Sequence, residues 1–152
     1  MQRWITLTVL TSALTGLTGV TGAAVPAWAD DDQATTTVTL GEAARIDANA
    51  GGRVRVDVAY VCTNPEDARS LTVTVEQKNP EDATATAFGS SRTAETDIVC
   101  DGTPQTREVI VQSKTYNWLP DLDAILTATI SDIGAAPPAA ADAKRITLVA
   151  AE

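Results

Sequence analysis

The sequence predicts an all-β fold, a single domain built as an antiparallel β-sandwich with one disulfide bond. Apolar and polar residues alternate with a period of two in several segments, which is the pattern of half-buried strands. Thr and Val are abundant, and both favour strands. Turn signals separate these segments every 8–12 residues or so, as in antiparallel sandwiches, and no long amphipathic helix pattern competes.

Residues 1–29 have the features of a secretory signal peptide. Arg3 gives a short positive region, and residues 5–25 form an apolar stretch without any charge. Ala27 and Ala29 supply the small-x-small pattern that signal peptidase recognises. The sequence therefore predicts cleavage after Ala29 and a secreted, extracellular product.

A transmembrane anchor is the alternative interpretation of the apolar stretch, since about 20 apolar residues span a bilayer. Thr and Gly dilute the stretch, and its small-x-small end is typical of a cleaved peptide. We therefore expect residues 30–152 to form one secreted domain that has no membrane attachment after cleavage.

The mature chain is strongly acidic. The chain holds 11 basic and 20 acidic residues, and cleavage removes only Arg3 from this balance. The negative electrostatic potential of such a chain repels nucleic acid, anionic lipid and acidic cell-wall polymers, which are therefore not expected as partners. Solubility outside the cell is the simpler explanation of the acidity.

The first half of the mature chain contains three expected strands. Residues 35–40 are Thr-rich, and residues 44–48 form a short second strand that ends at the turn signal of residues 49–52. Residues 53–62 are the clearest strand, because their apolar side chains alternate over ten positions and place Cys62 on the inward face.

The middle of the chain continues this pattern. Residues 71–77 alternate again with Leu and Val inward, and residues 83–88 are a weaker strand candidate. Residues 97–100 are expected to bring Cys100 to a turn at Asp101-Gly102.

The C-terminal part contains three more expected strands. Residues 108–113 (EVIVQS) are a further strand, residues 124–130 alternate with a strong inward face, and residues 145–150 close the chain. Residues 134–143 are rich in Pro and Ala, so we expect a loop there and not an interior strand.

Cys62 and Cys100 are expected to form a structural disulfide. Both lie in the exported part, where the setting is oxidising, and two cysteines allow only one connectivity. A zinc site needs two more ligands and the chain has no histidine, while a redox pair usually has the C-x-x-C spacing.

Three segments resemble a family of small secreted actinobacterial domains of unknown function with an immunoglobulin-like sandwich. They are RIDANAGGRVRVDVAYVC, IVCDGTPQTREVIV and LPDLDAILTATI. The resemblance implies an immunoglobulin-like β-sandwich and an extracellular location, but no activity and no functional residues. The cysteines depart from the antibody pattern, because no Trp lies between them and their spacing is short for a bridge between two sheets.

The residues predict no enzyme, no cofactor and no metal site. Without histidine there is no Ser-His-Asp triad, and no phosphate-binding or dinucleotide motif is present. The repeated Asn-Pro-Glu-Asp-Ala at residues 64–68 and 79–83 flanks a strand, which would hold the two copies too far apart for a paired-carboxylate site. No calcium-binding D-x-D-x-D-G loop occurs.

Tyr116, Asn117 and Trp118 form the one candidate ligand surface. Two aromatic rings two residues apart share a face in an extended segment, and aromatic platforms with amides hold sugars in many modules. In the alternative interpretation, Trp118 fills the end of the aliphatic core and Tyr116 covers it.

The function predicted is that of a secreted, non-enzymatic domain with a recognition or structural role. The sequence does not identify its partner, and an extracellular protein or a cell-surface component is the candidate class. Three alternatives stay open. A small-molecule carrier needs a lined cavity of more than about 300 Å³. A protease inhibitor needs a rigid exposed loop, for which residues 100–105 are the candidate, and a carbohydrate-binding module needs an exposed Trp118.

Overall fold

The computed structural model describes residues 36–63, 69–132 and 137–151, and the signal peptide expected at residues 1–29 lies outside them. The described part is all-β and contains one disulfide bond, as predicted. One short 3-10 turn, η1 (Glu95–Asp97), accompanies the strands. The strands are β1 (Thr37–Ile46), β2 (Arg53–Val61), β3 (Arg69–Lys78), β4 (Thr86–Arg92), β5 (Gln105–Gln112), β6 (Asp123–Asp132) and β7 (Ala140–Ala150).

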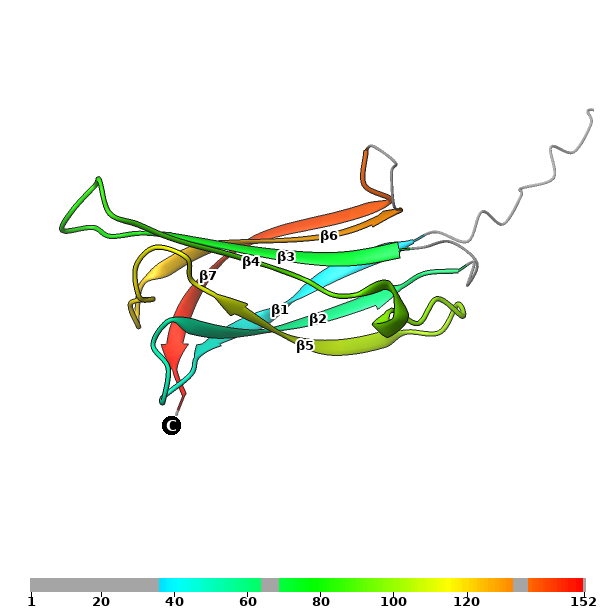
Figure 1. The fold of residues 1–152 in the computed structure, drawn as a ribbon, viewed down its shortest axis with the longest axis horizontal. Coiled ribbons are helices and arrows are strands. Elements are labelled where there is room, and N and C mark those ends of the chain that lie inside the picture. Colours follow the sequence, from blue (N-terminus) through cyan, green and yellow to red (C-terminus); the bar gives the residue numbers. More distant parts are fainter. Residues whose placement is uncertain (1–35, 64–68, 133–136, 152) are drawn as a thin grey trace, which may run out of the picture. The chain divides into compact units, whose positions relative to one another are not determined.

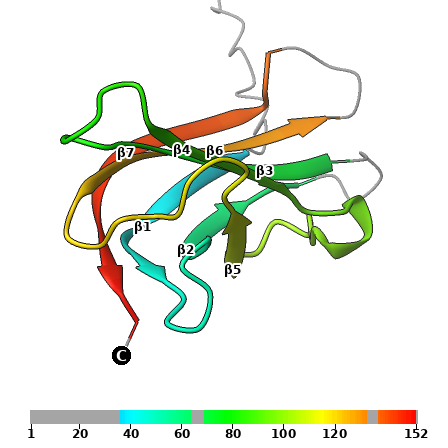
Figure 2. The same ribbon diagram turned by 60° about the vertical axis from the view of Figure 1, so that its left-hand side comes forward.

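The seven strands form one sheet in the order β4-β3-β6-β7-β1-β2-β5, and this sheet is folded over into two layers. Strands β4, β3, β6 and β7 make one layer, and β1, β2 and β5 make the other (Figure 1). Strand β7 belongs to both layers, because residues 140–147 pair with β6 and residues 148–150 pair with β1. Figure 2 shows β7 curving from one layer into the other.

One pairing corrects the antiparallel arrangement expected from the sequence. Five of the six strand pairings are antiparallel, but β1 and β7 pair in parallel through Ala44–Leu148, Arg45–Val149 and Ile46–Ala150. The end of β7 runs beside the end of β1 in the same direction once it has crossed between the layers. The first and last strands thereby join the two layers.

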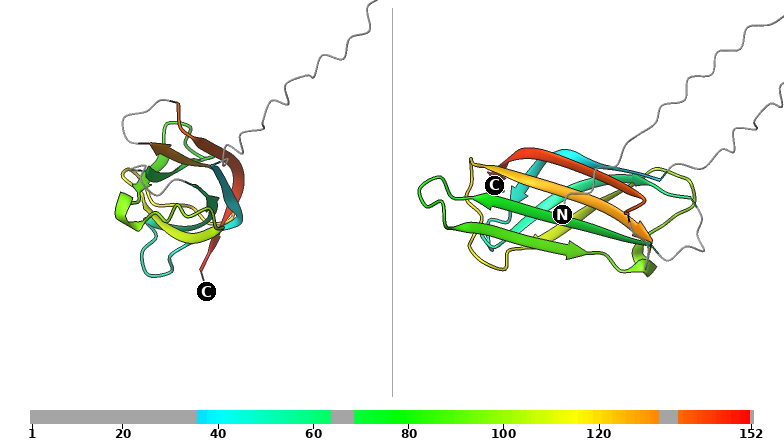
Figure 3. Two further views of the ribbon diagram at one scale, coloured as in Figure 1. Left: turned by 90° about the vertical axis from the view of Figure 1, so that its right-hand side faces the viewer. Right: turned by 90° about the horizontal axis from the view of Figure 1, so that it is seen from above.

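The two edge strands also meet, so that the sheet is nearly closed into a barrel (Figure 3, left). Gly89 of β4 and Ser113 beyond β5 form an antiparallel bridge. Next to it, the amide of Lys114 donates a hydrogen bond of 2.8 Å to the carbonyl of Phe88. These contacts close the seam at one end of the layers.

Several predicted strand boundaries were wrong. The strands expected at residues 35–40 and 44–48 are one strand, β1, whose register shifts between Leu40 and Ala44. Residues 97–100 bring Cys100 to the expected turn at Asp101-Gly102, but they are not part of a strand, since η1 ends at Asp97 and residues 98–100 are irregular. Part of the expected Pro/Ala loop, from Ala140 onward, belongs to the interior strand β7. The two prolines of this segment, Pro137 and Pro138, come before the strand begins.

The core lies between the layers and consists mainly of Val, Leu, Ile and Ala. Val54, Val56 and Val58 are fully buried, as the alternation of residues 53–62 predicts. Leu71 and Leu126 from the opposite layer are fully buried as well. At about 1.5–3 kcal/mol for each fully buried aliphatic side chain, this packing is the main favourable contribution to folding.

The disulfide joins Cys62, at the end of β2, to Cys100, which precedes β5. Both cysteines are buried at one end of the core. The amide of Gly102 donates a hydrogen bond of 3.0 Å to the carbonyl of Cys62, and the φ of Gly102 is 83°, a backbone conformation that favours glycine. The bridge thus fixes the turn that leads into β5, within one layer.

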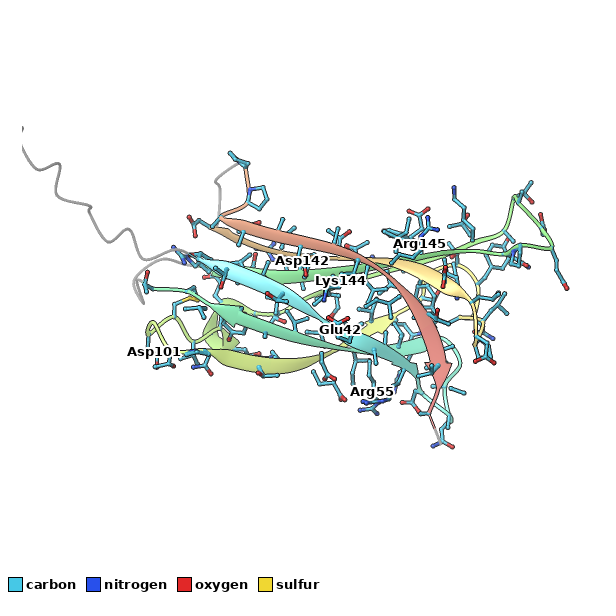
Figure 4. All side chains as sticks on the ribbon, turned by 180° about the vertical axis from the view of Figure 1, so that it is seen from behind. Glu42, Arg55, Asp101, Asp142, Lys144 and Arg145 are labelled. Atoms are coloured by element: carbon cyan, nitrogen blue, oxygen red, sulfur yellow. A yellow bond between two sulfur atoms is a disulfide. The ribbon has the colours of Figure 1, made fainter. Side chains whose placement is uncertain are left out.

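Side chains replace backbone pairing where β1 and β7 separate. Asp142 accepts a hydrogen bond of 2.8 Å from the amide of Leu40, and the Lys144 ammonium donates one of 2.9 Å to the carbonyl of Leu40. Lys144 also pairs with Glu42 at 2.6 Å. Figure 4 shows these three charged side chains gathered between β7 and β1. They satisfy the two backbone groups of Leu40 at the bulge of β1.

Candidate functional site

The candidate site lies in the segment 113–122, which connects β5 to β6 across the two layers. This segment contains all three residues of the predicted ligand surface, but the structure separates them. Tyr116 is 57% exposed and Asn117 is exposed, whereas Trp118 is only 3% exposed and belongs to the core. Trp118 therefore fills the end of the core, in agreement with the alternative interpretation, and only Tyr116 and Asn117 remain for a ligand surface.

Trp118 fastens this segment to the turn between β1 and β2. Its indole Nε1 donates a hydrogen bond of 3.1 Å to the carbonyl of Gly52, and its amide donates one of 3.0 Å to the carbonyl of Gly51. Ser113 adds a third link, because its amide donates to Gly52 at 2.7 Å. The buried indole thus has its polar group satisfied, as buried Trp side chains usually do.

The other side of the segment is tied to β4. The Thr115 hydroxyl donates a hydrogen bond of 2.8 Å to the carbonyl of Thr86 and accepts one of 3.0 Å from the amide of Phe88. Tyr116 and Asn117 lie between this attachment and that of Trp118. Their backbone is therefore held on both sides.

Gln77, which the sequence analysis did not single out, fixes the end of the segment. It is 2% exposed, and its amide group donates to the carbonyls of Leu119 at 2.9 Å and Leu122 at 3.3 Å. Its Oε1 accepts a hydrogen bond of 2.8 Å from the amide of Leu119. The signal was present, because Gln77 continues the inward series of residues 71–77 and places an amide where the pattern calls for an apolar side chain.

A small pocket of about 230 Å³ lies beside Tyr116 and Asn117. Ala85 and Ala87 of the β3–β4 hairpin contribute small apolar side chains, and Asn79 contributes a third amide to those of Asn117 and Gln77. The Asn79 side chain accepts a hydrogen bond of 2.9 Å from the amide of Glu81. Within the described part of the chain, the Tyr116 hydroxyl and the Asn117 amide group have no hydrogen-bond partner, so both are available to a ligand.

The three carboxyl groups with lowered pKa values, on Asp47, Asp82 and Asp101, stabilise turns. Hydrogen bonds from Thr103 and Thr84 lower the pKa of Asp101 and Asp82, respectively. The pKa of Asp47 is lowered mainly by a hydrogen bond from the Asn49 amide, and then by Arg55. Glu108 and then Asp47 raise the pKa of Arg55 (labelled in Figure 4), since each accepts a hydrogen bond from its guanidinium.

The disulfide-linked turn at residues 100–105, at the opposite end of the layers, is also held by hydrogen bonds. One carboxylate oxygen of Asp101 accepts hydrogen bonds from the amide of Thr103 at 2.9 Å and from its hydroxyl at 2.6 Å. Val99, next to the disulfide, is an exposed hydrophobic residue. The second Asn-Pro-Glu-Asp-Ala copy, residues 79–83, forms the turn between β3 and β4, and the first copy lies outside the described residues.

Residues 36–63, 69–132 and 137–151 contain no group of three His, Cys, Asp or Glu side chains able to hold a metal ion. The same residues contain no helix long and apolar enough to cross a membrane.

Comparisons with known proteins give no family assignment. No protein-family model matches the chain, and no curated protein matches it. A crystal structure of Spo0M, sporulation control protein, from Bacillus subtilis is similar with a TM-score of 0.36 and 11% identity. The similarity covers 77% of this chain and 49% of Spo0M, so this chain spans about half the length of that protein.

Proposed function

We propose that this chain is a secreted, non-enzymatic recognition domain. Residues 1–29 have the composition of a signal peptide that is cleaved after Ala29. The Cys62–Cys100 disulfide supports an oxidising location outside the cytoplasm. The resemblance to small secreted actinobacterial domains points to the same location.

We also propose that the fold is immunoglobulin-like. The layer of β1, β2 and β5 matches the A, B and E strands of immunoglobulin domains, and β3, β6 and β7 match C, F and G. Strand β4 pairs with β3, as an additional strand does beside C in variable domains. The Cys62–Cys100 bridge departs from that fold, because it lies within one layer.

The recognition surface is the segment that carries Tyr116 and Asn117. The observation that carries this proposal is an exposed aromatic ring on a backbone held on both sides. Tyr is enriched at binding surfaces because its ring is large, amphipathic and loses little conformational entropy on binding. The fixed backbone lowers the entropic cost of binding further.

The pocket beside Tyr116 favours a macromolecular partner over a small ligand. Its volume of about 230 Å³ is below the range of about 300–1,000 Å³ that is usual for small-molecule sites. The burial of Trp118 removes the aromatic pair on which the carbohydrate hypothesis depended. We therefore propose an extracellular protein or a protein component of a cell surface as the partner, with one of its side chains in the pocket.

Affinity capture tests this proposal. Immobilised residues 30–152 are incubated with spent culture medium and cell-wall fractions of the source organism, beside Tyr116→Ala and Val99→Ala variants. Both substitutions truncate exposed side chains, at opposite ends of the layers. We expect a captured protein that is retained by Val99→Ala and lost by Tyr116→Ala. Capture that survives Tyr116→Ala, or no capture at all, contradicts the proposal.

The turn at residues 100–105 favours a second candidate function, inhibition of a secreted protease. A rigid exposed turn beside a disulfide is what an inhibitory loop needs, and Val99 supplies an exposed apolar side chain for a specificity pocket. Inhibition assays with secreted endopeptidases test it. Inhibition by the wild type that Val99→Asp abolishes and Tyr116→Ala leaves intact favours this function, and the absence of inhibition excludes it for the enzymes tested.

A further inference from the structure

We propose that the seam between the edge strands β4 and β5 binds an extended segment of an extracellular protein as an added strand. Strands β4 and β5 are the two edges of the sheet. In strand addition, main-chain hydrogen bonds supply the affinity and alternate side chains supply the specificity. The site is separate from the Tyr116 segment, and it does not depend on the recognition function proposed there.

The seam is closed at two points and open between them. One closure is the bridge between Gly89 and Ser113. At the other, Arg107 of β5 donates a hydrogen bond of 2.6 Å to the carbonyl of Asp97 in η1, which lies beside the start of β5 in Figure 1. Residues 108–112 lie between the two closures and make about 17 Å of strand, at about 3.3 Å per residue.

The backbone of β5 has unused hydrogen-bonding groups along this open stretch. The amide of Ser113 donates to the carbonyl of Gly52 at 2.7 Å, and an antiparallel ladder forms such bonds only at alternate pairs. Counted along the register, Ile110 and Glu108 belong to the pairs whose amide and carbonyl groups point away from β2. In the described part of the chain, no strand pairs with Ile110 or Glu108 from that other side.

The edge of β4 is equally open across the seam. The amide of Thr93 donates to the carbonyl of Leu71 at 2.8 Å, so Arg92, the next residue in the register, directs its backbone groups away from β3. Phe88 is different, because its carbonyl accepts a hydrogen bond from Lys114 at the closed end of the seam. The chain thus covers one part of its own sheet edge and leaves the part at Arg92 uncovered.

A hollow of about 460 Å³ lies between these two edges. Arg92 of β4, Val109 and Ile110 of β5, and Asp97 of η1 are among the residues that line it. Because two of its walls are strand edges, the polar groups available there include backbone amides and carbonyls. An extended peptide carries the complementary groups at the same spacing, so another strand is the occupant that satisfies them.

This part of β5 also lacks the usual protection of a sheet edge. Proteins commonly protect exposed edges with proline, a bulge or a covering segment. Strand β5 contains no proline, and its register with β2 runs without a bulge. Ile110 is moreover 44% exposed. The open stretch is therefore a template for an incoming strand.

The charges at the η1 end of the seam favour a basic residue in the partner. Glu95 and Glu108 are both exposed there, and no ion pair among the described residues involves Glu95. Arg107 is already paired with the Asp97 carboxylate, at 3.7 Å. The whole chain has a net charge of −9, so a basic segment is attracted to this edge and a second acidic copy is repelled.

Antiparallel pairing with β5 sets the order of side chains in the bound segment. The residue opposite Ile110 exchanges both backbone hydrogen bonds with it and places its side chain beside that of Ile110, so an apolar residue fits. Two residues further along the segment, the side chain lies on the same face, opposite Glu108 and toward Glu95, where a basic residue fits. The geometry therefore selects extended segments of the pattern apolar-x-basic.

An NMR titration of isotope-labelled residues 30–152 with the capped peptide STVTKT tests the proposal. We expect the peptide to shift the amide signals of Ile110 and Glu108 and to slow their hydrogen exchange, and to leave those of Tyr116 and Asn117 unchanged. N-methylation of the peptide's valine removes the N–H that binds the Ile110 carbonyl and should abolish binding. This control leaves the protein itself unaltered.

A charge exchange tests the position of the basic residue. The peptide STVTET should bind the wild type about tenfold more weakly than STVTKT, and Glu95→Lys should reverse this preference. Glu81→Lys is the matched control, because Glu81 is also an exposed acidic residue but lies in the β3–β4 turn at the other end of β4. It should keep the preference of the wild type.

Three results would overturn the proposal. The first is STVTKT leaving the Ile110 and Glu108 amides unshifted, and the second is binding that survives N-methylation of the valine. The third is an unchanged peptide preference in Glu95→Lys. Protection of the same amides that grows with protein concentration, without peptide, would assign the edge to a second copy and would also contradict the proposal.

Discussion

Gly89 of β4 lies so close to Gln112 of β5 that a Cβ atom on Gly89 would be 2.5 Å from the Gln112 carbonyl oxygen. The Val111 side chain would be 2.9 Å away. Neither strand can accept this contact without moving, because the Gly89–Ser113 bridge holds the two edges together. The closure of the sheet therefore depends on the absence of a side chain at this position.

We expect Gly89→Ala to lower the free energy of unfolding by about 1–3 kcal/mol, the usual cost of overpacking. Gly51→Ala is the control, because its nearest atom would be 4.0 Å away on Asn117. Urea unfolding of both variants measures the difference. Equal stability of the two variants would show that the edges are not in contact.

Removal of the disulfide should be more costly. Cys62 and Cys100 are 38 residues apart, and a loop of this length corresponds to about 4 kcal/mol of chain entropy in the unfolded state. We expect a Cys62→Ala, Cys100→Ala double variant to unfold at a much lower guanidinium concentration than the wild type. Reduction of the wild type should have a similar effect. A decrease in the free energy of unfolding of less than about 1 kcal/mol would mean that the disulfide contributes little to stability.

The Asp142 side chain should be needed for stability. Asp142→Ala leaves the Leu40 amide without its hydrogen-bond acceptor in a partly buried place, at a cost of about 1–3 kcal/mol. Asp123→Ala is the comparison, since it loses only an exposed hydrogen bond from Thr147 and should cost less than about 1 kcal/mol. Thermal unfolding of both variants measures which one loses more stability. A larger loss for Asp123→Ala would contradict a stabilising role of the Asp142 contact between β1 and β7.

Acid should destabilise the fold through its turn carboxylates. The pKa values of Asp47, Asp82 and Asp101 are all lowered below the usual 3.8 in the folded state, mainly by hydrogen bonds from Asn49, Thr84 and Thr103. Their contribution is complete above the unfolded pKa and is lost as the pH falls through the lower folded values, because the unfolded state takes up protons first.

We therefore expect the urea midpoint of the wild type to fall below about pH 4. In a variant with Asn at all three positions, the midpoint should fall less steeply, since the amide oxygen keeps an acceptor in each turn but does not titrate. Identical pH profiles of the wild type and the variant would assign the acid sensitivity to other groups.

The sequence predicted those strands whose local pattern is strong. The alternation of Val54, Val56 and Val58 and the inward position of Cys62 were confirmed, because they follow from the pleat of a half-buried strand. Strand β7 was only partly predicted. Its first residues have a Pro/Ala-rich composition, and their pairing is decided by β6, a distant segment to which no local pattern refers.

The candidate site was also only partly predicted from the sequence. Tyr116 and Asn117 were found as chemically distinctive neighbours, but the sequence left the place of Trp118 open. The links through Thr115 and Gln77 were missed, because both residues bind backbone carbonyls of other elements. Only the Gln77 position carried a signal, an amide in an inward series of apolar residues.

The affinity of the captured partner for Tyr116→Ala tests the proposed recognition function most directly. Biolayer interferometry compares this variant with the wild type and with Val99→Ala at one ionic strength. We expect Tyr116→Ala to weaken binding by about tenfold or more, as truncation of an interface hot spot does, and Val99→Ala to leave it unchanged. Equal affinity of Tyr116→Ala and the wild type would contradict a recognition site in this segment.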